Sequence, residues 1–240
     1  MSEYAIKPLG PDTWDDFAGL AERHNGCWCA VHGSCWTGGD GCWCMRFQRS
    51  CIPKEPGDDN RGRKQRLVSD GRAHAALVFD GDAAVAWCQY GTPAELPDIY
   101  HRRQYEAGLG KLPDYRLTCL FVDKNCRGRG LAGVALRGAL ELIAQAGGGV
   151  VEAYPQDTGG QMIAASVLYS GTRSLFEQAG FSYDRPKGKY HCVMTRQISG
   201  HTTGTADQRQ ATTAAGTART FGSPGEFTAA KGEILGRSIH

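Results

Sequence analysis

The stretch RLTCLFVDKNCRGRGLAGVALRGALELIAQ, residues 116–145, decides the fold of this chain. Arg116 to Asp123 is an apolar run bounded by turn residues, which predicts a buried strand. Leu131 to Gln145 is apolar on most sides and stops at a triple glycine, which predicts a helix packed across a sheet. Because Val150 to Tyr154 is another strand-like run, the order strand, glycine loop, helix, strand predicts a parallel α/β unit.

The glycine loop itself, Arg127-Gly128-Arg129-Gly130-Leu131-Ala132, has the composition of an anion cradle. Glycines let consecutive backbone N–H groups converge on an anion at the positive end of a helix, and two arginines add charge. This geometry suits a pyrophosphate. No Gly-Lys-Ser or Gly-Lys-Thr follows, so the loop is not a P-loop, and the third glycine of a dinucleotide fingerprint is missing. A plain tight turn with solvated arginines is the structural alternative.

The remaining elements are predicted from periodicity and turn residues. The predicted helices lie between Pro11 and Asn25, from Asn60 to Asp70 and from Ser174 to Ala179. A hairpin joins His74–Phe79 to Ala83–Tyr90, Pro93 to Asp114 is a loop or a broken helix, and Tyr190–Ile198 closes the ordered body.

Composition bounds the class of protein. The 240 residues are 41% hydrophobic and 22% charged, which excludes wholesale disorder. A formal charge of +2 gives no pull toward nucleic acid or anionic lipid, so neither is an expected partner. No stretch approaches the roughly 20 apolar residues of a membrane helix, and Met1 to Gly10 lacks an export signal, so we expect a cytoplasmic protein with reduced or metal-bound cysteines.

The composition changes near the C-terminus. We predict an ordered domain over residues 1–198 and a Thr/Gly/Ala-rich flexible, disordered tail over residues 199–240, where Thr, Gly and Ala supply 22 of 42 residues. Such a segment buries too little apolar area to offset its ordering entropy. The capping-box spacing Ser223-Pro224-Gly225-Glu226 favours a short docking helix over 224–235 as the alternative.

The loop and its surroundings resemble the GNAT superfamily of acetyl-CoA-dependent N-acetyltransferases. The family signature, Arg or Gln, two residues, Gly, one residue, Gly or Ala, is matched by Arg127, Gly130 and Ala132. Val122 matches the family valine five residues before the arginine, and LFEQAGF at 175–181 is similar to the family's short helix ending in Gly-Phe.

The resemblance implies an α/β (α+β) fold with a mixed central sheet flanked by helices, and transfer of the acetyl group of acetyl-CoA to a primary amine. Transfer would be by direct attack in a ternary complex, with a backbone N–H near Phe121 or Val122 stabilising the oxyanion. The implied cofactor-binding residues are, for the pantetheine arm, the backbone of Leu120, Phe121 and Val122, and, for the pyrophosphate, the amides of Arg127, Gly128, Arg129, Gly130, Leu131 and Ala132.

The catalytic residues are less clearly indicated. In the family a tyrosine four residues before the Gly of Gly-Phe usually protonates the leaving thiolate, and this chain has Phe176 there. Tyr154 and Tyr169 are the candidate donors. Glu152 is the candidate base, because Glu152 and Tyr154 share one face of their strand by the two-residue period. Ordinary packing and surface roles are the alternatives for all three residues.

Cysteine and tryptophan are concentrated between Cys27 and Cys44. Cys27, Cys29, Cys42 and Cys44 would form a structural zinc site, but their one-residue spacing is tighter than usual. Apolar packing is the favoured interpretation and no metal is predicted, because Gly41-Cys42-Trp43-Cys44-Met45 resembles a segment of one poorly characterised GNAT branch. The alternative function is a non-catalytic acyl-CoA-binding regulatory module whose Cys-rich loop, with or without a stabilising zinc, is an interaction surface.

The sequence leaves the acceptor and the oligomeric state open. Arg102 and Arg103, if they face the cleft, would favour an anionic acceptor, although a solvated face is the simpler interpretation. Asp98, Glu106 and Asp114 would favour a cationic one.

Overall fold

The computed structural model describes residues 4–23, 41–159 and 168–201. They belong to one compact unit, Met1–Thr202. A tail was predicted over residues 199–240, and all of it from residue 202 onward lies outside the described residues. The helix predicted over 224–235 lies outside them as well.

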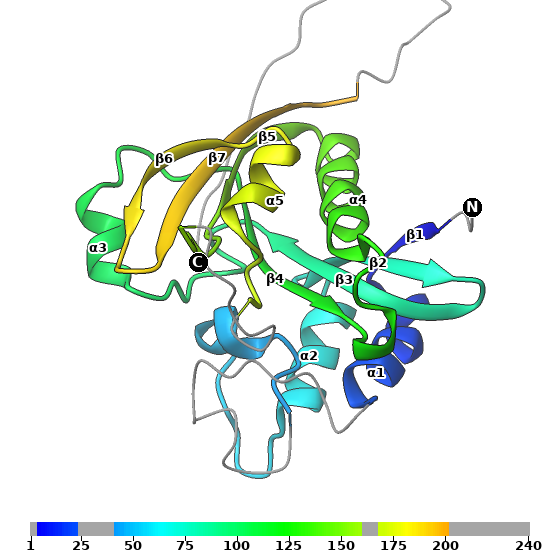
Figure 1. The fold of residues 1–240 in the computed structure, drawn as a ribbon. Helices are drawn as coiled ribbons and strands as arrows, with labels where there is room; N and C mark the ends of the chain where they lie inside the picture. Colours follow the sequence, from blue (N-terminus) through cyan, green and yellow to red (C-terminus); the bar gives the residue numbers. More distant parts are fainter. Residues whose placement is uncertain (1–3, 24–40, 160–167, 202–240) are drawn as a thin grey trace, which may run out of the picture. The chain divides into compact units, whose positions relative to one another are not determined.

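A mixed seven-stranded sheet forms the centre of this unit, in the order β1-β2-β3-β4-β5-β7-β6 (Figure 1). β4 and β5 are parallel, and every other neighbouring pair is antiparallel. The strands are β1 Ala5–Pro8, β2 His74–Asp80, β3 Ala83–Gly91, β4 Tyr115–Val122, β5 Gly148–Ala153, β6 Ser182–Lys187 and β7 His191–Ser199. The helices are α1 Trp14–Glu22, α2 Asn60–Ser69, α3 Arg102–Ala107, α4 Leu131–Gln145 and α5 Arg173–Gln178.

Helices cover both faces of the sheet because its strands are apolar on both sides. In β2, Ala76 and Val78 belong to the core under α4 and α5, whereas Ala75 and Leu77 belong to the core with α1 and α2. This is the period of two expected for a strand buried on both faces. α4 contributes the larger apolar stripe, with Leu131, Ala135, Leu136, Ala139 and Ile143 all buried against the sheet.

The predicted fold class, an α/β mixed sheet flanked by helices, is confirmed. The helix at 131–145 and the parallel strands on either side of it are confirmed to within two residues at each end. The two edge strands, β1 and β6, were not predicted. β6 has the sequence SYDRPK, which is mostly exposed and contains Pro186, and a proline-containing polar run gives no strand signal even though an edge tolerates it. None of the helices in the described parts of the chain is long and apolar enough to cross a membrane.

The glycine run after α4 provides a test of the fold. Gly148 has φ +72°, and a Cβ on it would meet the carbonyl oxygen of Ile198 in β7, whereas Gly147 has φ +106° and open space. We expect Gly148→Ala to lower the free energy of unfolding by roughly 1–3 kcal/mol more than Gly147→Ala, measured by urea denaturation of the full chain. Equal losses would show that β5 and β7 are not this close.

Candidate active site

The loop between β4 and α4 forms a cradle of backbone groups. Gly128 and Gly130 have φ +78° and +75°, in the left-handed region that favours glycine, and the space that a Cβ would occupy at either position is open. Gly130 is the N-cap of α4, whose first N–H groups have no partner within the helix. The cradle therefore presents N–H groups and the positive end of a 15-residue helix to solvent, which fits a pyrophosphate.

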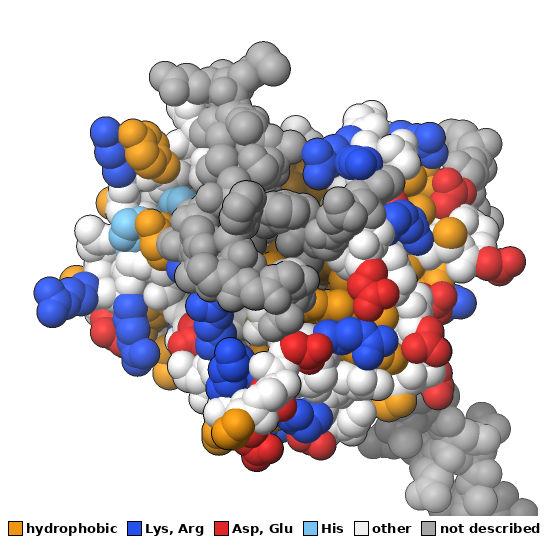
Figure 2. All heavy atoms as spheres, turned by 90° about the horizontal axis from the view of Figure 1, so that it is seen from below, with side chains coloured by type: hydrophobic (Ala, Val, Ile, Leu, Met, Phe, Trp, Pro, Cys, Tyr) orange, Lys and Arg blue, Asp and Glu red, His pale blue; other side chains and the backbone are white. Residues whose placement is uncertain are grey.

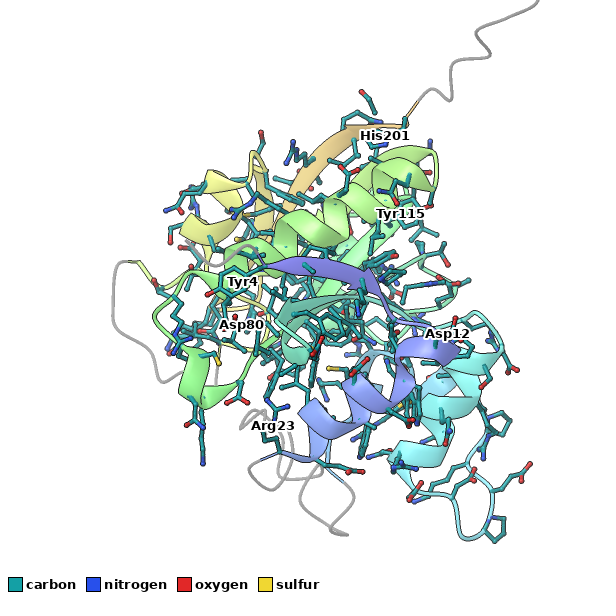
Figure 3. All side chains as sticks on the ribbon, turned by 90° about the vertical axis from the view of Figure 1, so that its right-hand side faces the viewer. Tyr4, Asp12, Arg23, Asp80, Tyr115 and His201 are labelled. Carbon is teal, nitrogen blue, oxygen red and sulfur yellow. The ribbon has the colours of Figure 1, made fainter. Side chains whose placement is uncertain are left out.

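A buried carboxylate fixes the start of this loop. Asp123 is 2% exposed; its Oδ1 accepts a hydrogen bond from the Asn125 N–H at 2.9 Å, and its Oδ2 accepts one from Arg23 Nη1 at 2.7 Å. Arg23, which follows α1 and is labelled in Figure 3, also donates to the Ala84 carbonyl in β3. The end of α1 is thus tied both to β3 and to the loop. Arg129 forms a long ion pair with Asp80, 3.7 Å between two exposed groups, which costs little to break.

Beside the cradle, β4 and β5 separate. Their ladder ends with Leu117 opposite Ala153, and β4 then continues to Val122 beyond the end of β5. Pro155 has no N–H with which to extend the ladder, and Gln156 instead forms bridges with Thr172 and His191. From residue 118 to residue 122, the edge of β4 that faces away from β3 thus has no strand beside it among the described residues. We call this the open edge of β4.

The backbone direction along β4 decides which groups face this edge. The Asp123 N–H donates to β3, whereas the Leu120 N–H donates to the carbonyl of Tyr169 at 2.7 Å. Because successive N–H groups of a strand point to opposite edges, the Val122 N–H lies on the open edge and the Phe121 N–H on the β3 edge. Of the two N–H groups predicted near the oxyanion, those of Phe121 and Val122, only the Val122 N–H lies on the open edge. The Leu120 N–H also faces this edge, but it is already hydrogen-bonded to the Tyr169 carbonyl.

A buried polar group lies at the end of the β4–β5 ladder. Glu152 Oε2 accepts hydrogen bonds from Tyr105 Oη at 2.8 Å and from Tyr154 Oη at 2.9 Å. Arg116, opposite Glu152 in the register, donates to Tyr105 Oη at 3.2 Å, and Arg185 lies 3.8 Å from Glu152 Oε1. The carboxylate is thus paired with cations and donors, as a buried charge requires.

Both tyrosines of this group are held in the protonated form. Burial raises the pKa of Tyr154 well above its usual value; Arg116 opposes this shift and Glu152 adds to it. Burial likewise raises the pKa of Tyr105. Each hydroxyl therefore remains a hydrogen-bond donor at neutral pH.

The structure brings two of the three predicted catalytic residues, Glu152 and Tyr154, into direct contact. Tyr169 is buried in the same apolar cluster as Tyr154, with its ring 6.3 Å from that of Phe47. Tyr105 was missed. It lies on the short helix α3, within the segment Pro93 to Asp114, whose sequence has no periodicity that indicates which side chains turn inward.

Phe176, at the usual tyrosine position, is a core residue. It is 2% exposed and packs edge-on against Phe181 with 5.2 Å between the ring centroids. It belongs to the core under α4, whereas Tyr154 lies in the cluster on the opposite face of the sheet.

The described part of the Cys-Trp segment packs as an apolar layer. Cys42, Trp43 and Cys44 are buried, and Cys44 Sγ lies 2.9 Å from Cys119 Sγ and 3.2 Å from Trp87 Nε1. Within residues 4–23, 41–159 and 168–201, no three His, Cys, Asp or Glu side chains are grouped as metal ligands. Two of the four cysteines considered as zinc ligands, Cys27 and Cys29, lie outside these ranges.

Four of the five charged residues considered for acceptor binding, all except Arg103, have structural partners among the described residues. Arg102 pairs with Glu106 in a solvent-exposed i, i+4 contact at 2.7 Å. Asp98 accepts hydrogen bonds from Ser50, and Asp114 accepts one from the Val150 N–H. These contacts give the acidic residues roles in loop and strand geometry.

Basic side chains meet instead near the β6–β7 turn. Lys187 and His191 are opposite each other in the register and 2% and 7% exposed. Lys187 Nζ lies 5.0 Å from the ring centroid of Tyr154, and the rings of His101 and His191 are 6.4 Å apart. Burial, with Arg46 adding to the effect, lowers the pKa of Lys187 to about 8. On the face drawn in Figure 2, histidine side chains lie beside hydrophobic ones, with Lys and Arg side chains nearby.

No family model matches this sequence, and no curated protein matches it. Solved structures with similar folds are acetyltransferases, several of them described as GNAT proteins, the family that the sequence resembles. One from Thermus thermophilus is 18% identical, with 81% of this chain and 97% of that chain covered and a TM-score of 0.41. A GNAT-family acetyltransferase from Streptococcus pneumoniae is 15% identical, with 82% and 100% covered and a TM-score of 0.45.

A third similar structure is the PaiA N-acetyltransferase of Thermoplasma acidophilum in complex with coenzyme A. It is 10% identical, with 81% of this chain and 99% of that chain covered and a TM-score of 0.43. At these identities and scores the likenesses carry no argument about activity, which is argued below from the geometry of this chain.

The buried histidine predicts an acid-sensitive stability. Burial, with Lys187 and His101 adding to the effect, lowers the pKa of His191 to about 4 from 6.5. A group whose folded-state pKa is depressed binds its proton first in the unfolded chain, so stability falls as the pH drops from about 6.5 to 4. We expect wild type to lose about 3 kcal/mol relative to His191→Gln over this window.

Urea denaturation of both proteins at several pH values measures this difference. Above about pH 7.5 the difference is expected to be constant, because His191 is then neutral in both the folded and the unfolded chain. A difference that stays constant down to pH 4 would mean that His191 is not buried beside cations.

Proposed function

We propose that this protein is an acetyl-CoA-dependent N-acetyltransferase that moves the acetyl group to a primary amine in a ternary complex. The observation that carries the proposal is the juxtaposition of the glycine cradle at the start of α4 with the open edge of β4. In this proposal the cradle holds a pyrophosphate, and the open edge of β4 offers main-chain partners to a pantetheine amide. Both lie in one continuous stretch, residues 118–132.

In this proposal the amides of Arg127 to Ala132 bind the pyrophosphate and the open edge of β4 binds the pantetheine arm. The Val122 N–H is available on that edge. The Leu120 N–H exchanges the carbonyl of Tyr169 for a pantetheine carbonyl, so residues near Tyr169 move when the co-substrate binds. The acetyl thioester then lies where β4 and β5 separate, beside the polar group around Glu152.

The transfer itself needs a neutral amine. Its nitrogen forms a bond to the acetyl carbon, the electron pair moves to the carbonyl oxygen, and the Val122 N–H stabilises that oxyanion. The C–S bond then breaks, and coenzyme A leaves as a thiolate or takes a proton from Tyr154 or Tyr169. A thiol pKa near 8.5 makes unassisted departure feasible, which fits the apolar residue at Phe176.

Glu152 is the proposed base, and its contacts also support a second contribution. Because both tyrosine hydroxyls donate to its Oε2, Glu152 orients Tyr154 while its charge is balanced by Arg116 and Arg185. The amine proton reaches Glu152 directly or through a water, as general base catalysis requires.

The first experiment is a thermal-shift titration with acetyl-CoA. A ligand at 100 times its Kd adds about 2.7 kcal/mol to stability, which is an easily measured rise in melting temperature. We expect a saturable rise in wild type that is lost in Gly130→Glu, because the new carboxylate fills the open space of the cradle and repels the pyrophosphate.

Gly57→Glu is the matched control. Gly57 is an exposed loop residue that also has a positive φ, +85°, and open space, so it receives the same charge and the same backbone strain. It should keep the wild-type shift. No shift in folded wild type would overturn the proposal, and binding without acetylation of any amine would point to a non-catalytic acyl-CoA-binding module instead.

A second prediction concerns the tyrosine at the centre of the polar group. With any accepted amine, Tyr154→Phe should lower kcat about a hundredfold and leave the Kd for acetyl-CoA unchanged, because it removes a donor without touching the cradle. Release of the coenzyme A thiol measures turnover. Tyr183→Phe, at a 42% exposed position of β6, should leave both quantities unchanged. A wild-type kcat in Tyr154→Phe would remove this hydroxyl from the mechanism.

A further inference from the structure

The β6–β7 hairpin presents a buried cation with no anion of its own. Lys187 is 2% exposed, and its Nζ lies near two aromatic rings, those of Tyr154 at 5.0 Å and Tyr100 at 5.9 Å. No hydrogen bond or ion pair of this ammonium is found among the described residues. Ring faces offset only part of the cost of burying a charge, so an isolated lysine here is expensive.

The groups around Lys187 add to the positive charge. Arg46 has its guanidinium 5.2 Å from the ring of Tyr100 and a buried Nε without a hydrogen-bond partner in the described parts of the chain. His191, on the strand opposite Lys187, has a buried Nε2 that is likewise without a partner there. Lys187, Arg46 and His191 thus all lie around the ring of Tyr100, the last 6.1 Å from it between ring centroids, and none of the three nitrogens has a hydrogen-bond partner among the described residues.

The nearest opposite charge is already used. Glu152 accepts hydrogen bonds from both tyrosine hydroxyls and lies 3.8 Å from Arg185. Asp184 pairs with Arg185. The three remaining cations, Arg46, Lys187 and Arg116, face only the carboxylate of Glu152 among the described residues, which leaves an excess of positive charge. In a low-dielectric surrounding such an excess favours an anion strongly over a cation.

We propose that Lys187, His191 and Arg46 bind an oxyanion, a carboxylate or a phosphate, that belongs to the amine acceptor itself. The inference rests on the proposed acetyl transfer and names its substrate class: amines that also carry an acidic group. Polyamines and other purely cationic amines are excluded by the same charges.

The position of the site relative to the chemistry supports this assignment. The ring of Tyr154 contacts Lys187, while its hydroxyl binds Glu152 at the end of the β4–β5 ladder. An acceptor anchored at Lys187 therefore reaches the thioester across a single side chain. His101, which stands at a positive φ of +54° before α3, borders the site from the opposite side.

The test compares amines in pairs that differ only in the anion. The carboxylate pairs are β-alanine with propylamine and L-phenylalanine with 2-phenylethylamine, and the phosphate pair is phosphoethanolamine with ethanolamine. With full-length protein and acetyl-CoA, we expect kcat/KM to be at least tenfold higher for the anionic member of one type of pair, which also identifies the oxyanion. Equal or higher rates for the members without the anion, in every pair, would overturn the inference.

Lys187→Met separates the anion site from the rest of the reaction. Met replaces a buried, unpaired ammonium with an apolar chain of similar length, so the melting temperature should be unchanged or higher. The preferred amine with an anionic group should lose at least tenfold in kcat/KM, and its counterpart without that group less than twofold. Lys189→Met, which removes an exposed lysine two residues away, should change neither. If Lys187→Met does not fold, Arg46→Met provides the same comparison.

The two proposals fail in different ways. Without an acetyl-CoA shift the proposed function fails, and N-acetyl-β-alanine or inorganic phosphate alone then tests the oxyanion site by a thermal shift that Lys187→Met abolishes. With an acetyl-CoA shift and no preference for anionic amines, the transferase stands and the oxyanion site is refuted.

Discussion

The parting of β4 from β5 is the constraint on which the rest of the site depends. Parallel strands share a ladder only while both can donate and accept, and Pro155 ends the contribution of the β5 side directly after Tyr154. The main-chain groups on the open edge of β4 must then find other partners, as the Leu120 N–H does with the carbonyl of Tyr169. A ligand rich in amides binds to such an edge by forming main-chain hydrogen bonds in place of those that the edge makes within the protein.

The same separation explains where the buried charges lie. Arg116 and Glu152 occupy the last part of the ladder, on the face away from α4, and together with Tyr105 and Tyr154 they fill the space that apolar side chains fill elsewhere. The two tyrosine hydroxyls that donate to Glu152 offset part of the cost of burying its carboxylate, and this contact positions the hydroxyl of Tyr154.

Much of this arrangement is readable from sequence, for identifiable reasons. Leu131 to Gln145 and its flanking strands are local patterns of period 3.6 and period two, and the glycines at 128 and 130 indicate the left-handed turn between them. The strand period places Glu152 and Tyr154 on one face, and the structure adds the hydrogen bond between them. The predicted roles of these residues in catalysis and cofactor binding stay predictions, since a side-chain contact does not define a reaction.

What sequence could not provide is contact between distant segments. Tyr105 reaches Glu152 from α3, a six-residue helix in a segment without a sequence period. Lys187, on the polar edge strand β6, lies near the ring of Tyr100, and so does Arg46, which is far away in the chain. Lysine in SYDRPK has the pattern of a solvated residue, and only the tertiary structure reveals that it is buried.

The burial of Lys187 in a strand with a polar sequence indicates a function for its charge. Local propensity and the global fold agree over most of this chain, and where they disagree, a charge is retained at a cost in stability that an apolar side chain would avoid. The pKa of Lys187, lowered to about 8, and that of His191, lowered to about 4, both report this cost. A bound oxyanion would reverse it, since it pairs the ammonium and supplies an acceptor for the imidazole. The ring of Tyr154 separates this charge from Glu152, so acceptor binding and proton transfer would share one side chain, each in contact with a different part of it.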